Sequence, residues 1–201
     1  MKKIFIPIAA VLLISLGVLF VGCGQGEKLK NLLKIAQSTE GLESLVNVVL
    51  FVDEYATEDP ELAASLSDES LTLTVFAPNN EAFVAAGLDF DEDGIVESED
   101  LIAIADGDET GFADFLLDIV LYHLVPDTAY DSDAIVALIG DPDGIDTAAE
   151  VALLVTKPDT DIILDPEDGT QEAALTSTLD IEASNGIAHI IADVLGLLGP
   201  Q

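Results

Sequence analysis

The sequence predicts a mixed α+β domain in which a helix-rich first part is followed by short strands. Apolar residues recur at helical spacing over much of residues 29–139. Residues 71–77 instead alternate apolar and polar side chains, as strands do. The last third consists of short apolar runs separated by Asp, Pro and Gly turns. Helices followed by strands favour an α+β domain over a doubly wound sheet.

Helices are expected wherever apolar residues return every three or four positions. Leu42, Leu45 and Val49 follow this spacing, and Glu43 in the first turn suits the helix dipole. Asn79 is placed to cap a helix that contains Phe83. The predicted helices cover residues 29–36, 42–49, 60–66, 79–84, 101–105, 112–120, 134–139 and 192–198.

The strands are expected to form the other half of the fold. In residues 71–77, Leu71, Leu73 and Val75 would share one face, and Pro78 would end the strand. Further strands are predicted at residues 151–156, 161–164, 175–181 and 186–190.

The chain is strongly acidic, with 39 Asp and Glu against 6 basic residues, all of them lysine, and a formal net charge of −33. Three lysines lie at positions 28, 30 and 34, and only Lys157 follows them. Such a field repels nucleic acid, which excludes a nucleic-acid-binding function. An acidic, solvated surface suited to a saline habitat is the simplest interpretation, because salt would screen the repulsion.

The first 22 residues are predicted to be an export signal. Lys2 and Lys3 precede an uncharged apolar run that continues to Gly22, and length alone allows either a cleaved signal or a retained anchor. The run ends at the only cysteine, Cys23, and residues 19–23 (LFVGC) resemble a bacterial lipoprotein signal. The resemblance implies lipidation of Cys23, a tether over 23–27 and attachment at the extracytoplasmic face of the outer or cytoplasmic membrane, with secretion as the alternative.

Three segments, in order, resemble the fasciclin-like FAS1 domain: residues 73–83 (LTVFAPNNEAF), 121–126 (LYHLVP) and 180–191 (DIEASNGIAHII). The resemblance covers roughly residues 28–199. It implies a β-wedge of two sheets with helices packed at one side, and a role in adhesion or extracellular interaction without catalysis. It also implies that His123 and His189 are packed residues bound to backbone, since no third histidine or cysteine completes a zinc site.

An acidic loop at residues 89–100 matches the spacing of an EF-hand-type calcium loop. Gly94 stands where that loop turns sharply, and the twelfth position is Asp100, as in dockerin modules, where EF-hands have Glu. Ile95 would offer its backbone carbonyl and pack its side chain inward. We therefore expect one structural Ca²⁺ within an insertion over about residues 88–109, with ligands Asp89, Asp91, Asp93, Ile95, Glu97 and Asp100.

Other functions find less support. The sequence has no G-x-S-x-G, no H-E-x-x-H and no phosphate-binding loop, so an enzyme is not expected. A glycoside-hydrolase pair of carboxylates stays open as an alternative in so acidic a chain. A dockerin-like docking protein is the other alternative, although the second calcium loop of such modules is missing. The expected partners are a membrane, reached through the lipid, and an unknown protein or polysaccharide at the cell surface.

Overall fold

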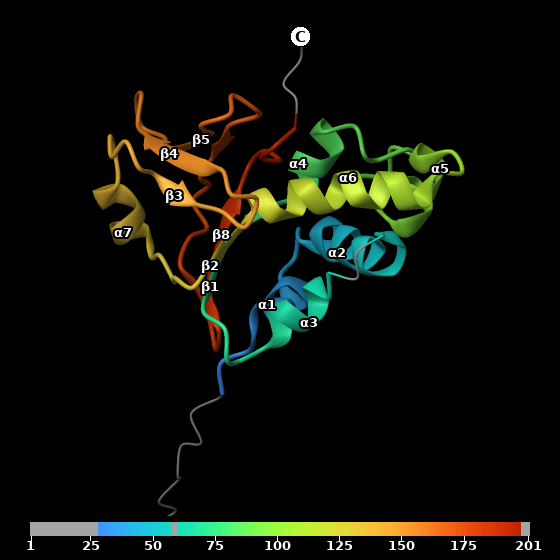
Figure 1. Ribbon diagram of the computed structural model, residues 1–201, viewed down its shortest axis with the longest axis horizontal. Coiled ribbons are helices and arrows are strands. Elements are labelled where there is room, and N and C mark those ends of the chain that lie inside the picture. Colours follow the sequence, from blue (N-terminus) through green and yellow to red (C-terminus); the bar gives the residue numbers. More distant parts are fainter. Residues whose placement is uncertain (1–27, 58–59, 198–201) are drawn as a thin grey trace, which may run out of the picture.

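The computed structural model describes residues 28–57 and 60–197 as two sheets and a group of helices (Figure 1). The expected signal peptide, the tether and Cys23 lie outside the described residues. Among those described, no helix combines the length and apolarity needed to cross a bilayer. The helices are α1 (Leu32–Ser38), α2 (Glu43–Tyr55), α3 (Leu62–Ser67), α4 (Asn80–Ala85), α5 (Ser98–Ala105), α6 (Glu109–Tyr122) and α7 (Ser132–Ala137).

The first sheet has the strand order β2-β1-β8-β7 and forms the centre of the molecule. Its strands are β1 (Leu73–Pro78), β2 (Leu124–Pro126), β7 (Ile181–Ala183) and β8 (Gly186–Ile191). β1 and β8 are parallel, with Leu73 opposite Gly186 and Pro78 opposite Ile191. Because β1 and β8 are neighbouring strands, the first and last of the three segments that resemble FAS1 lie side by side, although they are far apart in sequence.

The second sheet is antiparallel throughout, in the order β3-β4-β5-β6. Its strands are β3 (Ile145–Asp146), β4 (Ala152–Thr156), β5 (Ile163–Pro166) and β6 (Ala173–Ala174). Helices α1 to α6 pack on one side of the first sheet, and the second sheet with α7 lies on the other (Figure 1). The α+β class and the wedge of two sheets are therefore confirmed.

Strand β1 is buried on both faces, whereas the sequence pattern predicted one buried face. Leu73, Val75 and Ala77 join the helical core, and Phe76 joins the core against the second sheet. Leu71, expected on the buried face, precedes the strand and is exposed. A central strand covered on two sides needs no polar face, so the alternation described only half of its environment.

Two predicted elements near the C-terminus are wrong. Residues 175–180 form no strand; only the bridge of Leu175 to Ile191 and the short β7 at Ile181–Ala183 occur there. Residues 192–197 form turns where a helix was expected. Val194 and Leu195 are nevertheless buried, so their helix-like spacing reflects burial of an irregular segment.

Gly186 is required by a close approach between two backbones. The turn joining β7 to β8 consists of Ser184 and Asn185, and Gly186 is the first residue of β8, with φ +149°. A Cβ added there would lie 1.9 Å from the carbonyl oxygen of Leu73. Glycine therefore allows the parallel pairing of β1 and β8 to begin at this position.

Candidate metal centre

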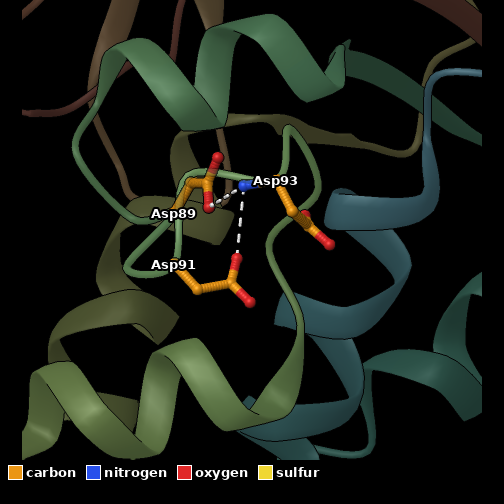
Figure 2. Close-up of side chains that lie close together, drawn as sticks. All are labelled: Asp89, Asp91 and Asp93. Carbon is orange, nitrogen blue, oxygen red and sulfur yellow. Dashed lines mark hydrogen bonds between the residues drawn. The ribbon is translucent and has the colours of Figure 1, made fainter.

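The acidic loop lies between α4 and α5 and brings three of the predicted ligands together (Figure 2). One carboxylate oxygen from each of Asp89, Asp91 and Asp93 lies within 4.8 Å of the other two. Asp89 is half-buried, whereas Asp91 and Asp93 are exposed. Oxygen-rich, partly hydrated sites of this kind suit a hard divalent cation such as Ca²⁺.

Backbone amides of the loop hold the aspartates in place. Asp89 accepts bonds from the amides of Glu92 (2.8 Å) and Gly94 (2.9 Å). Asp91 accepts a bond from the Asp93 amide at 3.2 Å, which Figure 2 shows. Gly94 has φ +97°, a conformation that permits the sharp turn. The loop is therefore organised by its own hydrogen bonds, with the carboxylates on one side.

Asp100 and Glu97, the other predicted carboxylate ligands, lie outside this group of three within the described residues. Asp100 is buried, and its Oδ1 accepts bonds from the amides of Phe90 (3.2 Å) and Asp91 (3.3 Å). Its Oδ2 accepts a bond from the Glu97 amide at 2.8 Å. The two residues form a capping box at the start of α5. Asp100 thus connects the start of the loop to the helix that follows.

Mutual repulsion is visible in the acidity of two of these groups. Desolvation, followed by the charge of Asp93, raises the pKa of the Asp91 carboxyl. The charge of Asp93, followed by desolvation, raises the pKa of the Glu97 carboxyl. Glu97 is therefore close enough to Asp93 and Asp91 for their charges to raise its pKa. A bound cation would favour the ionised form of all these groups.

The loop is attached to the helical core through its eighth residue, Val96, which is fully buried. The Val96 amide donates to Ser44 Oγ (2.9 Å), and Asn47 Nδ2 donates to the Val96 carbonyl (2.9 Å). Both partners lie on α2. The prediction that Ile95 packs inward is wrong: Ile95 is only half-buried, and its neighbour Val96 occupies the core.

Sequence reasoning missed Ser44 and Asn47. They lie more than forty positions before the loop, and the buried Ser44 was hidden in an otherwise apolar helical pattern. The only signal in the sequence was Ser44 itself, a small polar residue on the apolar face of α2. Such a residue needs a hydrogen-bond partner, which here is a backbone group distant in sequence.

Comparison with known families supplies the identity of the fold. The family model described as the fasciclin domain matches residues 53–197, which is more than half of the chain. The chain belongs to the fasciclin family. The segments that carried the sequence resemblance coincide with β1 and α4, the α6–β2 junction, and the β7–β8 hairpin.

Among solved structures, the chain is similar to the FAS1 domain pair of the insect cell adhesion molecule fasciclin I. The TM-score is 0.59 at 18% sequence identity, and the match covers 84% of this chain and 51% of that one. The chain thus spans about half of the length of this FAS1 pair, and at this identity the likeness concerns the fold alone. No curated protein matches the sequence significantly.

Proposed function

We propose that this fasciclin-family protein is a lipid-anchored surface module that mediates adhesion or matrix interaction without catalysis, and that one Ca²⁺ orders its acidic loop. Membership of the family, whose domains are typically adhesion modules, is the observation that carries the functional part. The cysteine after the apolar leader supports the anchor. The convergence of Asp89, Asp91 and Asp93 supports the calcium site.

In this proposal Asp89, Asp91 and Asp93 supply side-chain oxygens, and the Ile95 carbonyl and Glu97 complete the protein ligands with water. Asp100 holds both ends of the loop through its backbone contacts. We expect weak binding, with Kd on the order of 10⁻⁴–10⁻³ M, as in extracellular modules. The ion would neutralise local repulsion and stabilise the insertion against α2.

Calcium titration with a thermal-unfolding readout tests the site. At a free concentration about 100-fold above Kd, Ca²⁺ should stabilise the protein by about 2.7 kcal/mol. Asp89→Ala and Asp93→Ala should abolish this gain because each removes a direct ligand. The matched control is Asp141→Ala, which removes the same charge and a similar contact, since Asp141 accepts the Asp143 amide at 3.0 Å.

Magnesium at equal ionic strength separates specific binding from screening, because Mg²⁺ demands a tighter octahedral site. If Mg²⁺ stabilised the protein as well as Ca²⁺ did, or if Asp141→Ala lost the response as fully as Asp89→Ala, the loop would not be a calcium site.

The anchor is tested by radiolabelled fatty acid and membrane fractionation. Cys23→Ser should abolish labelling and release the protein, whereas a membrane-retained variant would indicate an uncleaved apolar segment. For adhesion, beads carrying the protein should retain envelope protein or polysaccharide. Release of reducing ends from that polysaccharide would instead favour the glycoside hydrolase alternative.

A further inference from the structure

The described chain begins at a narrow end of the molecule, where three segments meet (Figure 1, bottom). Lys28 Nζ lies 2.7 Å from Glu69 Oε2, and the Ser184 amide donates to the Lys30 carbonyl at 2.9 Å. We call this end the apex and define it by residues 28–31, 68–72 and 184–185. The two contacts fix all three segments as one surface.

The apex differs in charge from the rest of the protein. Lys28 and Lys30 lie on it together with Asp68 and Glu69, so its formal charge is zero, and Lys34 lies on the adjoining α1, whereas only Lys157 follows these lysines in the sequence. Lys30 Nζ donates to the neutral hydroxyl of Ser38 at 2.9 Å, so that contact leaves its charge uncompensated. The remaining surface carries most of the excess of acids.

Exposed apolar side chains accompany these lysines. Leu29 is 51% exposed and Leu71 is 37% exposed. Beside Leu29 lies a groove of 460 Å³ whose lining includes Lys28, Lys30, Ile181 and the acidic Glu182. Leucine flanked by lysine is the pattern of surfaces that rest in a membrane interface, with the stems in the apolar layer and the charges at the head groups.

The position of the lipidation residue places this surface near a bilayer. Four residues lie between Cys23 and Lys28, and the five residue-to-residue steps span at most about 18 Å. If Cys23 carries lipid, as proposed above, the apex cannot move farther than this from the head groups. The rest of the body is held at a greater distance.

We propose that the apex docks on an anionic phospholipid surface. Lys30 contacts the lipid phosphates, and Leu29 and Leu71 enter the interface. The inference rests on the proposed anchor. The negative body is repelled by such a surface within about one Debye length, near 8–10 Å, whereas the apex, whose formal charge is zero, lacks this net repulsion. In this orientation the apex contacts the membrane, and the acidic loop between α4 and α5, at the opposite end of the molecule, faces away from it (Figure 1).

The absence of tryptophan from the sequence makes a direct test practical, because one introduced tryptophan is the only such fluorophore. Leu29→Trp is introduced into the full lipidated chain, which is reconstituted in vesicles of phosphatidylglycerol and phosphatidylcholine. We expect a blue-shifted emission and strong quenching by brominated lipid. The matched control is Phe115→Trp on α6, where the native side chain is 47% exposed; this reporter should not be quenched.

The charge dependence completes the test. Vesicles of phosphatidylcholine alone, added NaCl, or Lys30→Gln should each reduce quenching of the Leu29→Trp reporter at least several-fold. A reporter that is unquenched on anchored protein overturns the docking and leaves the anchor intact. Quenching on phosphatidylglycerol vesicles in a chain that takes up no lipid label supports docking and overturns the anchor. Equal quenching of both reporters overturns the proposed orientation.

Discussion

His123 and His189 are buried, and backbone groups engage both nitrogens of each ring. His123 Nδ1 donates to the Ile119 carbonyl (2.9 Å), and its Nε2 accepts from the Leu195 amide (3.0 Å). His189 Nε2 donates to the Tyr130 carbonyl (2.8 Å), and its Nδ1 accepts from the Asp180 amide (3.3 Å). Each ring is therefore neutral, with its tautomer set by its partners. The two histidines join distant segments, and all four ring nitrogens have backbone partners.

Protonation of His123 should destabilise the fold. Burial lowers the pKa of His123 to about 4, against an ordinary value near 6.5. The stability it contributes is full above about pH 6.5 and is lost as the pH falls towards 4, because the unfolded chain takes up the proton first. The loss should reach about 3 kcal/mol, at roughly 1.36 kcal/mol per unit. Urea unfolding of the wild type and His123→Gln at several pH values measures it, and parallel pH profiles would contradict it.

Acidic residues occupy backbone conformations with positive φ in this protein. All six non-glycine residues with positive φ in the described part of the chain are Asp or Glu, and three of them are Glu61, Glu92 and Glu150. Asp tolerates this region, but Glu has no such preference. Local conformational preference therefore does not explain these glutamates.

At the scale of elements, the acidic loop and α5 are packed into the helical core. Leu101 of α5 and Val96 are both fully buried in the helical core. Since Val96 also bonds to α2, the acidic loop and the core share one set of contacts. Stabilisation of the loop should consequently reach the whole domain.

Truncating Leu101 tests this packing. Leu101→Ala should lower the free energy of unfolding by about 2–5 kcal/mol, because a fully buried leucine leaves a cavity. The adjacent Ile102 is 40% exposed, so Ile102→Ala is the matched control and should cost much less. Urea unfolding measures both. Similar small losses in the two variants would indicate that α5 is only loosely attached.

Sequence patterns predicted some elements and contacts correctly and missed others, and the reasons are physical. The strand at β1 and the capped helix at α4 were found because Pro78 and Asn79 act locally. The bond from the Val96 amide to Ser44 could not be predicted, since it depends on how distant segments pack. Residues 192–197 were wrongly predicted to be a helix, because buried apolar residues in a turn can show the same spacing as a helix.

For the whole molecule, charge and packing act against each other. Both faces of the central sheet are covered, so the core is well built, yet the chain carries a formal charge of −33. Within the described residues, Lys28 and Glu69 form the only ion pair that involves a lysine. Many carboxylates instead accept bonds from backbone amides and hydroxyls, as Asp114 does from Thr57 and Asp180 from Ser132. These contacts satisfy the oxygens without neutralising the charge.

Unfolding should therefore require a higher temperature as NaCl is added. Screening relieves repulsion between acids, and each roughly 1 kcal/mol gained at Tm raises it by about 2–4 °C for a chain of this size. A chelator is kept in the buffer so that divalent cations do not contribute. Most of the gain should come below about 1 M NaCl, where the Debye length has already fallen to about 3 Å; a steady rise beyond this would indicate strengthened burial of apolar surface instead.

Charge-reversal variants separate the screening of charge repulsion from the strengthened burial of apolar surface. Asp159 and Glu167 are exposed, and in the described part of the chain neither side chain supports a loop through a hydrogen bond that we observe. Replacing both by lysine should raise Tm at low salt and flatten the salt response, because less repulsion is left to screen. The matched control replaces Thr160 and Thr170, which are neutral, with serine. If Tm of the wild type were flat in NaCl, the acidic surface would already be compensated, and its excess charge would not limit stability.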